Sequence, residues 1–226
     1  MTDLRLVIFD VDGTLVDSQA HILAAMAQAF AANGLSTPPR AEILQIVGLS
    51  LPVAMARLAP DRPDLTAPLV EAYKGAFAAL RVADDDAALS PLFPGARDQL
   101  TGLAAQDFTL LGVATGKSRR GLTHLFEMHD IAPLFHTVQV ADDHPSKPHP
   151  AMIAACLLET GVAADHAVIL GDTTYDIQMG RAAGIHALGV AWGYHRPEAL
   201  MAAGACAVLD RFDDLPGALE KVFQRP

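Results

Sequence analysis

Six short runs rich in apolar residues alternate with segments of helical periodicity over most of the chain. The runs lie at residues 6–9, 109–114, 137–140, 167–170, 186–190 and 207–209. The helical segments lie at residues 96–104, 119–127, 150–159, 175–183, 197–202 and 215–223. Strands that are apolar on both faces need cover on both faces, and helices between successive strands supply it. The pattern therefore predicts an α/β fold with a doubly wound, mostly parallel sheet.

One long segment, residues 17–90, breaks this alternation because it contains helical periodicity and no strand pattern. Its predicted helices lie at residues 18–33, 39–47, 51–58 and 67–81, separated at Gly34, Pro60 and Pro63. We expect two domains: an α/β core formed by residues 1–16 and 91–226, and a small all-helical cap formed by residues 17–90. The connectors at residues 15–17 and 84–95 are candidate hinges.

Composition limits the functions that such a chain can have. The formal net charge is −10, whereas binding to nucleic acid or to an anionic membrane surface requires a basic face. The apolar stretches are too short for a signal peptide or a membrane span, and the two cysteines are too few for a disulfide framework. We therefore expect a cytoplasmic protein with no nucleic-acid or membrane partner. An anionic substrate would need positive charge supplied locally.

Two acidic clusters directly follow predicted strands. Asp10 and Asp12 lie in the segment Asp-Val-Asp-Gly-Thr after the first strand, where two neighbouring carboxylates repel each other unless a cation or a shared proton intervenes. Asp172 and Asp176 follow the fourth strand and share one face of a helix that starts near Thr173. Either cluster alone could be a turn or a helix cap.

Two further polar segments follow the second and third strands. Thr115 and Gly116 end the second strand, and their hydroxyl and backbone N–H groups could hold a phosphate oxygen, with Ser118 capping the next helix. Lys147, one of only four lysines, precedes a proline in the loop after the third strand. A nucleotide-binding P-loop is the rival interpretation, but only three residues separate Gly112 from Gly116 where four are required.

Ligands of parallel α/β sheets bind at the carboxyl ends of the strands, so we expect the four clusters to meet at one edge. Several carboxylates, a hydroxyl and one lysine brought together would repel each other without a metal ion. Their hard oxygen atoms suit Mg²⁺, and the lysine would clamp a phosphate beside it. The sequence thus predicts a magnesium site that handles a phosphate group.

With these four segments in order along the whole chain, the sequence resembles the phosphatase branch of the haloacid dehalogenase superfamily. Asp10 to Thr14 resemble the first family motif, Thr115 the second, Lys147 the third, and Gly171 to Asp176 the fourth. The helical segment is similar to the small cap of that family. The segments Asp17-Ser18 and Val47-Gly48-Leu49-Ser50-Leu51 look most like phosphoglycolate phosphatases, although Ser50 replaces a proline that is frequent there.

The resemblance implies a phosphatase that hydrolyses a small phosphate ester through an aspartyl-phosphate. Asp10 would be the nucleophile and Asp12 the general acid and base. Thr115, Gly116 and Lys147 would bind the phosphoryl oxygens. Mg²⁺ would be held by Asp10, the backbone carbonyl of Asp12 and Asp172, with Asp176 in support. The acid at position 12 excludes the dehalogenase chemistry, which lacks it.

Substrate choice is less constrained. Phosphoglycolate is the leading candidate substrate, and Gln45, Arg57 and Lys74 are candidate residues of the cap for recognising the leaving group. A sugar-phosphate mutase, with His21 near the cap histidine of that branch, and a pyrophosphatase remain alternatives. A non-catalytic phosphate-binding module is the alternative of another class. The sequence does not indicate an oligomeric state.

Overall fold

The computed structural model describes residues 4–83 and 90–224, and its centre is a six-stranded sheet in the order β3-β2-β1-β4-β5-β6. All five strand pairings are parallel, which confirms the predicted fold class. The strands are β1 (Arg5–Phe9), β2 (Thr109–Thr115), β3 (Thr137–Val140), β4 (Ala167–Gly171), β5 (His186–Val190) and β6 (Ala207–Leu209). Each lies within one residue of its predicted bounds.

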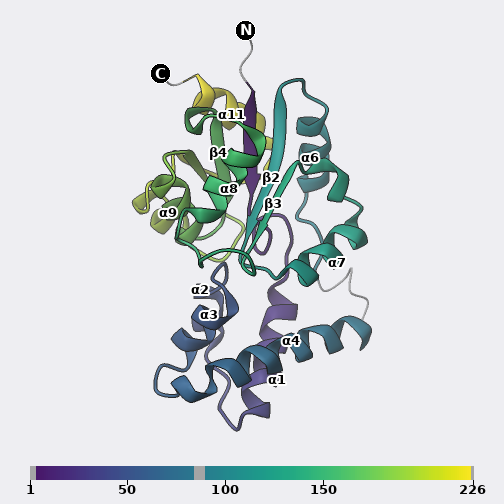
Figure 1. Ribbon diagram of the computed structural model, residues 1–226, viewed down its shortest axis with the longest axis vertical. Helices are drawn as coiled ribbons and strands as arrows, with labels where there is room; N and C mark the ends of the chain where they lie inside the picture. The colour runs from purple at the N-terminus through teal and green to yellow at the C-terminus, as the bar shows by residue number, and fades with distance from the viewer. Residues whose placement is uncertain (1–3, 84–89, 225–226) are drawn as a thin grey trace.

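Helices cover both faces of the sheet, as a doubly wound fold requires (Figure 1). The helices of the α/β part are α6 (Ala96–Ala104), α7 (Arg119–His129), α8 (Ala151–Thr160), α9 (Thr174–Ala182), α10 (Pro197–Ala202) and α11 (Leu215–Phe223). Alternate residues of β1 point to opposite faces. Val7 and Phe9 pack with residues of α6, α7 and α11, whereas Leu6 and Ile8 pack with residues of α8, α9 and α10. Two apolar layers therefore enclose the sheet.

Four of the described helices between β1 and β2 form a third apolar cluster. They are α1 (Gln19–Ala32), α2 (Arg40–Gln45), α3 (Leu51–Leu58) and α4 (Thr66–Ala83). Their buried core includes Met26, Phe30, Met55 and Leu69, and Figure 1 shows them gathered at one end of the sheet. Among the described residues, no helix is long and apolar enough to cross a membrane.

The chain enters and leaves this helical segment side by side. Asp17 donates its backbone N–H to the carbonyl of Pro91, and Phe93 donates to the carbonyl of Leu15, both at 2.9 Å. Val16 and Leu92 thereby form an isolated antiparallel bridge. Both predicted connectors are thus tied together at the sheet, although residues 84–89 of the second connector lie outside the described part of the chain.

Truncating a central strand residue should destabilise the fold far more than truncating an exposed one. Ile8 is fully buried on β1, so Ile8→Ala should lower the free energy of unfolding by about 2–5 kcal/mol in urea denaturation, through lost burial and a residual cavity. Leu158 is 85% exposed, and the control Leu158→Ala should change it by less than about 0.5 kcal/mol. Equal effects of the two substitutions would contradict this packing.

Candidate active site

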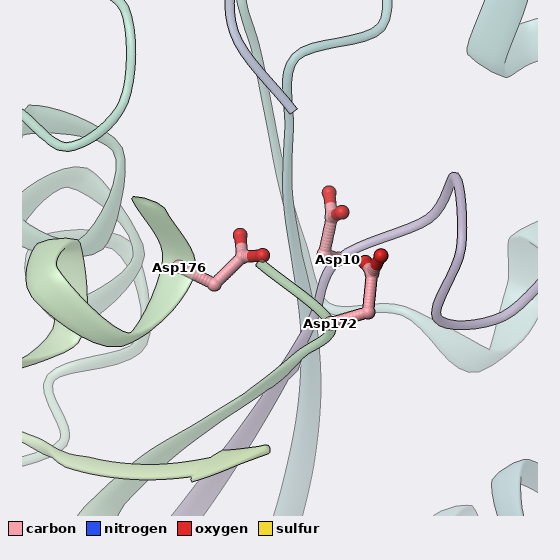
Figure 2. A group of neighbouring side chains, drawn as sticks. All are labelled: Asp10, Asp172 and Asp176. Atoms are coloured by element: carbon pink, nitrogen blue, oxygen red, sulfur yellow. The ribbon is translucent and has the colours of Figure 1, made fainter. Parts of the chain in front are cut away.

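Three carboxylates meet where β1 and β4 end. The two strands pair in register through Phe9 and Leu170, so the residues that follow them, Asp10 and Asp172, emerge side by side. Asp176 joins them from the first turn of α9. Carboxylate oxygens of Asp10, Asp172 and Asp176 all lie within 4.8 Å of one another, and all three residues are almost completely buried (Figure 2). The expected meeting of the first and fourth clusters is present.

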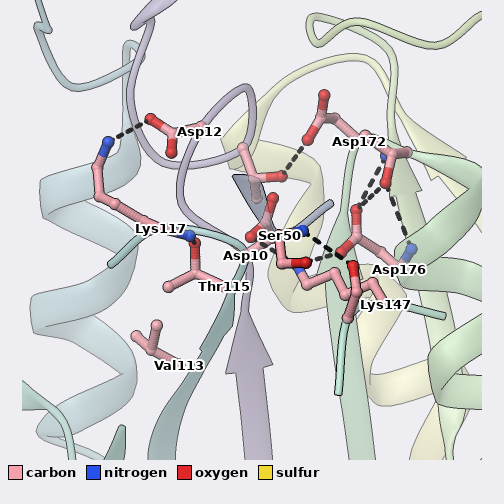
Figure 3. Close-up of polar contacts among 12 residues, drawn as sticks. Asp10, Asp12, Ser50, Val113, Thr115, Lys117, Lys147, Asp172 and Asp176 are labelled. Atoms are coloured by element: carbon pink, nitrogen blue, oxygen red, sulfur yellow. Dashed lines mark hydrogen bonds and ion pairs between the residues drawn. The ribbon is translucent and has the colours of Figure 1, made fainter. Parts of the chain in front are cut away.

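A buried lysine bridges two of these carboxylates. Lys147, from the loop between β3 and α8, is 1% exposed. Its Nζ donates to Oδ1 of Asp10 and to Oδ1 of Asp176, each at 2.7 Å (Figure 3). The other oxygen of Asp10, Oδ2, is buried and has no hydrogen-bond partner in the part of the chain that the structure describes. A buried carboxylate oxygen without a partner is costly, so this atom is available to a ligand.

The other two carboxylates are fixed by short contacts. Thr173 caps α9, and its backbone N–H and its hydroxyl both donate to Oδ2 of Asp176, at 3.0 and 2.6 Å. Asp172 accepts from the hydroxyl of Thr14 at 3.0 Å and from the backbone N–H of Tyr194 at 2.9 Å. Each carboxylate orientation is therefore set before any ligand binds.

Burial and crowding change the proton affinities in this cluster. Burial, opposed by Lys147 and reinforced by Asp176, raises the pKa of Asp10 to about 7. Burial, together with the charges of Asp10 and Asp176, raises the pKa of Asp172 well above its ordinary value. Burial alone lowers the pKa of Lys147, but the two carboxylates outweigh it and raise that pKa, so the ammonium stays charged. One lysine does not neutralise three carboxylates, and the cluster favours a further cation.

Asp12 lies in a separate polar setting, toward the helical segment. Its Oδ1 accepts from the hydroxyl of Ser18 at 2.6 Å and from Nζ of Lys117 at 2.8 Å. The hydroxyl of Tyr194 lies 3.3 Å from Ser18 Oγ, and burial raises the pKa of that phenol, so it stays protonated. Asp12 is therefore held by Ser18, just before α1, and by Lys117, from the loop after β2, while Tyr194 contacts Ser18 from the loop after β5.

Gly13 allows the tight turn that follows Asp10 and Asp12. Its φ is +88°, in the region that favours glycine, and a Cβ there would lie 2.7 Å from Cε2 of Tyr194 and would also overlap the carboxylate of Asp172. The Asp-x-Asp-Gly pattern thus brings the backbone close to the fourth cluster, and its glycine cannot be replaced without displacing Asp172.

Thr115 is the last residue of β2, the strand next to β1, and Gly116 follows it. Thr115 is 1% exposed, and its hydroxyl oxygen accepts from the backbone N–H of Lys117 at 3.2 Å, which leaves the hydroxyl proton free to be donated. Gly116 packs against the helical segment, since a Cβ there would lie 2.5 Å from the carbonyl oxygen of Gly48. Ser118 caps α7 as expected, accepting from Gly121 N–H at 3.2 Å.

The three candidate cap residues lie in two places. Lys74 lines a cavity beside Asp12 and pairs with Glu71 at 2.9 Å. Arg57 instead donates to the hydroxyl of Tyr175 at 2.8 Å, and Gln45 accepts from that hydroxyl through its backbone carbonyl at 2.9 Å. Arg57 and Gln45 therefore join the helical segment to α9, outside the described cavity lining.

Several contacting residues were not assigned roles from the sequence. Lys117, Ser18 and Thr14 lie inside or beside the recognised motifs, and the scarcity of lysine that drew attention to Lys147 applied equally to Lys117. The sequence around Tyr194 and Thr173 gives less indication that these residues belong to the site. Tyr194 follows β5 by four residues, and no local pattern indicates that its loop reaches both Asp172 and Ser18.

Comparison with known proteins shows which family the sequence matches. The family model described as haloacid dehalogenase-like hydrolase matches residues 7–190. A protein of Dickeya dadantii named "Probable phosphatase IndB" is 34% identical over 223 residues, covering 97% of this chain and 95% of the relative. A "Phosphoglycolate phosphatase" of Rhodospirillum rubrum is 33% identical over 219 residues, covering 93% and 89%.

Solved structures share the fold at lower identity. The "predicted phosphatase from Clostridium acetobutylicum" superposes with a TM-score of 0.85 at 21% identity, covering 97% of this chain and all of that one. The "predicted phosphoglycolate phosphatase" of Haemophilus somnus has a TM-score of 0.83 at 22% identity, covering 96% and 99%. The resemblance drawn from the four motifs is confirmed, and the chain belongs to the haloacid dehalogenase-like hydrolase family.

Proposed function

We propose that the protein is a Mg²⁺-dependent phosphomonoester hydrolase that works through an aspartyl-phosphate on Asp10. The observation that carries the proposal is the buried Asp10 carboxylate, with one oxygen on Lys147 and the other without a partner among the described residues. An oxygen that is oriented but not blocked is suited to attack phosphorus. The relatives named as phosphatases support the reaction class.

The carboxylate cluster fits a divalent metal ion. Asp10, Asp172 and Asp176 bring hard oxygen atoms within 4.8 Å of one another, and burial raises the pKa of both Asp10 and Asp172, as expected where positive charge is needed. Asp10 and Asp172, with the backbone carbonyl of Asp12, would hold Mg²⁺, and Asp176 would support them while anchoring Lys147. When bound, the ion would neutralise charge on the cluster and on a phosphate.

In the first step, a carboxylate oxygen of Asp10 bonds to phosphorus and the bond from phosphorus to the ester oxygen breaks. Asp12, as a carboxylic acid, gives its proton to the leaving oxygen so that an alcohol departs. Lys147 and Thr115 then donate hydrogen bonds to the phosphoryl oxygens, with the backbone N–H of Gly116. Both side chains are almost fully buried, so these donors act away from bulk water.

In the second step, water attacks the phosphorus of the aspartyl-phosphate and gives a proton to the Asp12 carboxylate. The bond from phosphorus to Asp10 breaks, which releases inorganic phosphate and restores both residues to their starting states. Ser18 and Lys117 orient Asp12 for both proton transfers.

Residues 17–90 are proposed as a cap that closes over the substrate, with residues 1–16 and 91–226 as the core. Closure would exclude water during the reaction. Lys74 would influence which ester is accepted from the cavity lining, whereas Gln45 and Arg57 would do so indirectly, through their contacts with Tyr175. Phosphoglycolate, named in the relatives, is the reference ester for a first assay. Mutase, pyrophosphatase and phosphate-binding functions, and a cytoplasmic location, stay predictions from the sequence.

Removing the nucleophile should abolish turnover without unfolding the protein. Asp10→Asn should lower kcat for phosphate release from phosphomonoesters by at least about a thousandfold, because an amide is a poor nucleophile. Wild-type activity should require Mg²⁺ and vanish in excess EDTA. A circular dichroism melt is the control for folding. Activity of the variant within tenfold of wild type, or wild-type turnover in EDTA, would overturn the proposal.

The raised pKa of Asp10 makes metal-free stability depend on pH. Its pKa is about 7 in the folded protein and 3.8 when exposed, so its contribution is fully present below about pH 4 and is lost as pH rises through 7. In EDTA, the melting temperature of Asp10→Asn should therefore increase relative to wild type between about pH 5 and pH 8. Mg²⁺ should reduce that difference. A difference independent of pH in EDTA, or unchanged by Mg²⁺, would contradict this electrostatic account.

A further inference from the structure

A cavity of about 300 Å³ lies between the helical segment and the loop after β2. Its wall includes Asp12, Gly116 and Lys117 on one side and residues of α1, the loop between α2 and α3, and α4 on the other. Pockets for drug-sized ligands begin at about this volume. The space is therefore larger than the two-carbon glycolate group requires.

The side that belongs to the helical segment is almost entirely apolar. It includes Met26, Val47, Leu49, Ala54, Tyr73 and Phe77. Met26 and Ala54 belong to the buried core of the helical segment, which holds this wall in place. An apolar group gains free energy by entering such a cavity, whereas an unpaired carboxylate loses its hydration there.

The position of Asp12 indicates that the cavity would receive the alcohol half of the substrate. Asp12 is the proposed proton donor to the leaving oxygen, and it borders the cavity, whereas Asp10 is absent from the described lining. A phosphate attacked by Asp10 with its ester oxygen toward Asp12 therefore directs its alcohol into this space.

Two lysines at the cavity pair with carboxylates, and the lining also includes Arg120 from α7 and Asp142 from the loop after β3, which carry opposite charges. Lys117 pairs with Asp12 at 2.8 Å, with side chains 9% and 12% exposed, and its Nζ lies 5.1 Å from the centre of the Phe77 ring. Lys74 pairs with Glu71. A leaving group with its own carboxylate would compete with Asp12 for Lys117 and disturb the proton donor. An uncharged leaving group avoids that competition.

We propose that the alcohol half of the substrate is a bulky, uncharged and mainly apolar group that fills this cavity. The inference rests on the proposed phosphatase function and narrows its substrate class. It ranks phosphoglycolate below esters of larger apolar alcohols. The helical segment would thus select the substrate through apolar contacts with its alcohol group, as well as by covering the site.

A series of straight-chain alkyl phosphates tests the proposal, because leaving-group acidity stays nearly constant from ethyl to hexyl phosphate. With Mg²⁺, kcat/KM should rise about fourfold for each buried methylene until the cavity is filled. Hexyl phosphate should exceed both ethyl phosphate and phosphoglycolate by at least tenfold. A flat or falling series, or phosphoglycolate as the best substrate, would overturn the cavity assignment while leaving the phosphatase proposal intact. No release of phosphate from any ester would overturn both.

A matched pair of variants tests whether the alkyl group of the substrate occupies this cavity. Ala78 lines the cavity from α4, and its neighbour Ala79 is exposed and outside the described lining. Ala78→Leu should lower the ratio of kcat/KM for hexyl to ethyl phosphate about tenfold, because the added side chain occupies the space. Ala79→Leu makes the same change on the same helix and should leave that ratio unchanged. Equal ratios in both variants would contradict the assignment, and the wild-type series stands independently if Ala78→Leu fails to fold.

Discussion

The ammonium of Lys147, held between Asp10 and Asp176 at 2.7 Å from each, is the interaction on which the rest of the site depends. Three buried carboxylates would be prohibitively costly without it, and one lysine leaves negative charge uncompensated. That imbalance favours a divalent cation, and a phosphate can approach only beside positive charge. The overall formal charge of −10 makes this local arrangement necessary rather than incidental.

The sheet and the helical segment divide the work of the site. The sheet places Asp10, Thr115 and Asp172 at adjacent strand ends, where the proposed chemistry on the phosphate would take place. The helical segment between β1 and β2 supplies the apolar wall of the cavity that we propose for the leaving group. Asp12 lies between the sheet and the helical segment and is held by Ser18 and Lys117. The residue proposed to move the proton therefore lies between the groups proposed to act on the phosphate and the cavity proposed to select the alcohol.

Sequence patterns predicted the strands, the helices and the acidic clusters, because each depends on local periodicity or on position at a strand end. They did not predict the contacts of Tyr194, which lies 176 positions from Ser18 in sequence and reaches it through a loop with no distinctive pattern. They likewise identified Gln45 and Arg57 as polar residues of the helical segment, but not that these contact Tyr175. The sequence did not predict the cavity, because its wall is formed by several separate helices. Helical periodicity does not indicate how those helices are oriented relative to the core.

Direct detection of a phosphorylated Asp10 tests the central claim. Wild-type protein would be mixed rapidly with an aryl phosphate and Mg²⁺, quenched in acid during turnover, digested and analysed by mass spectrometry. The account predicts a phosphoryl group on the peptide that carries Asp10, absent when EDTA replaces Mg²⁺ and more abundant in an Asp12→Asn variant, where hydrolysis of the intermediate is slowed. Turnover with no modified peptide, or with the phosphoryl group on another residue, would contradict it.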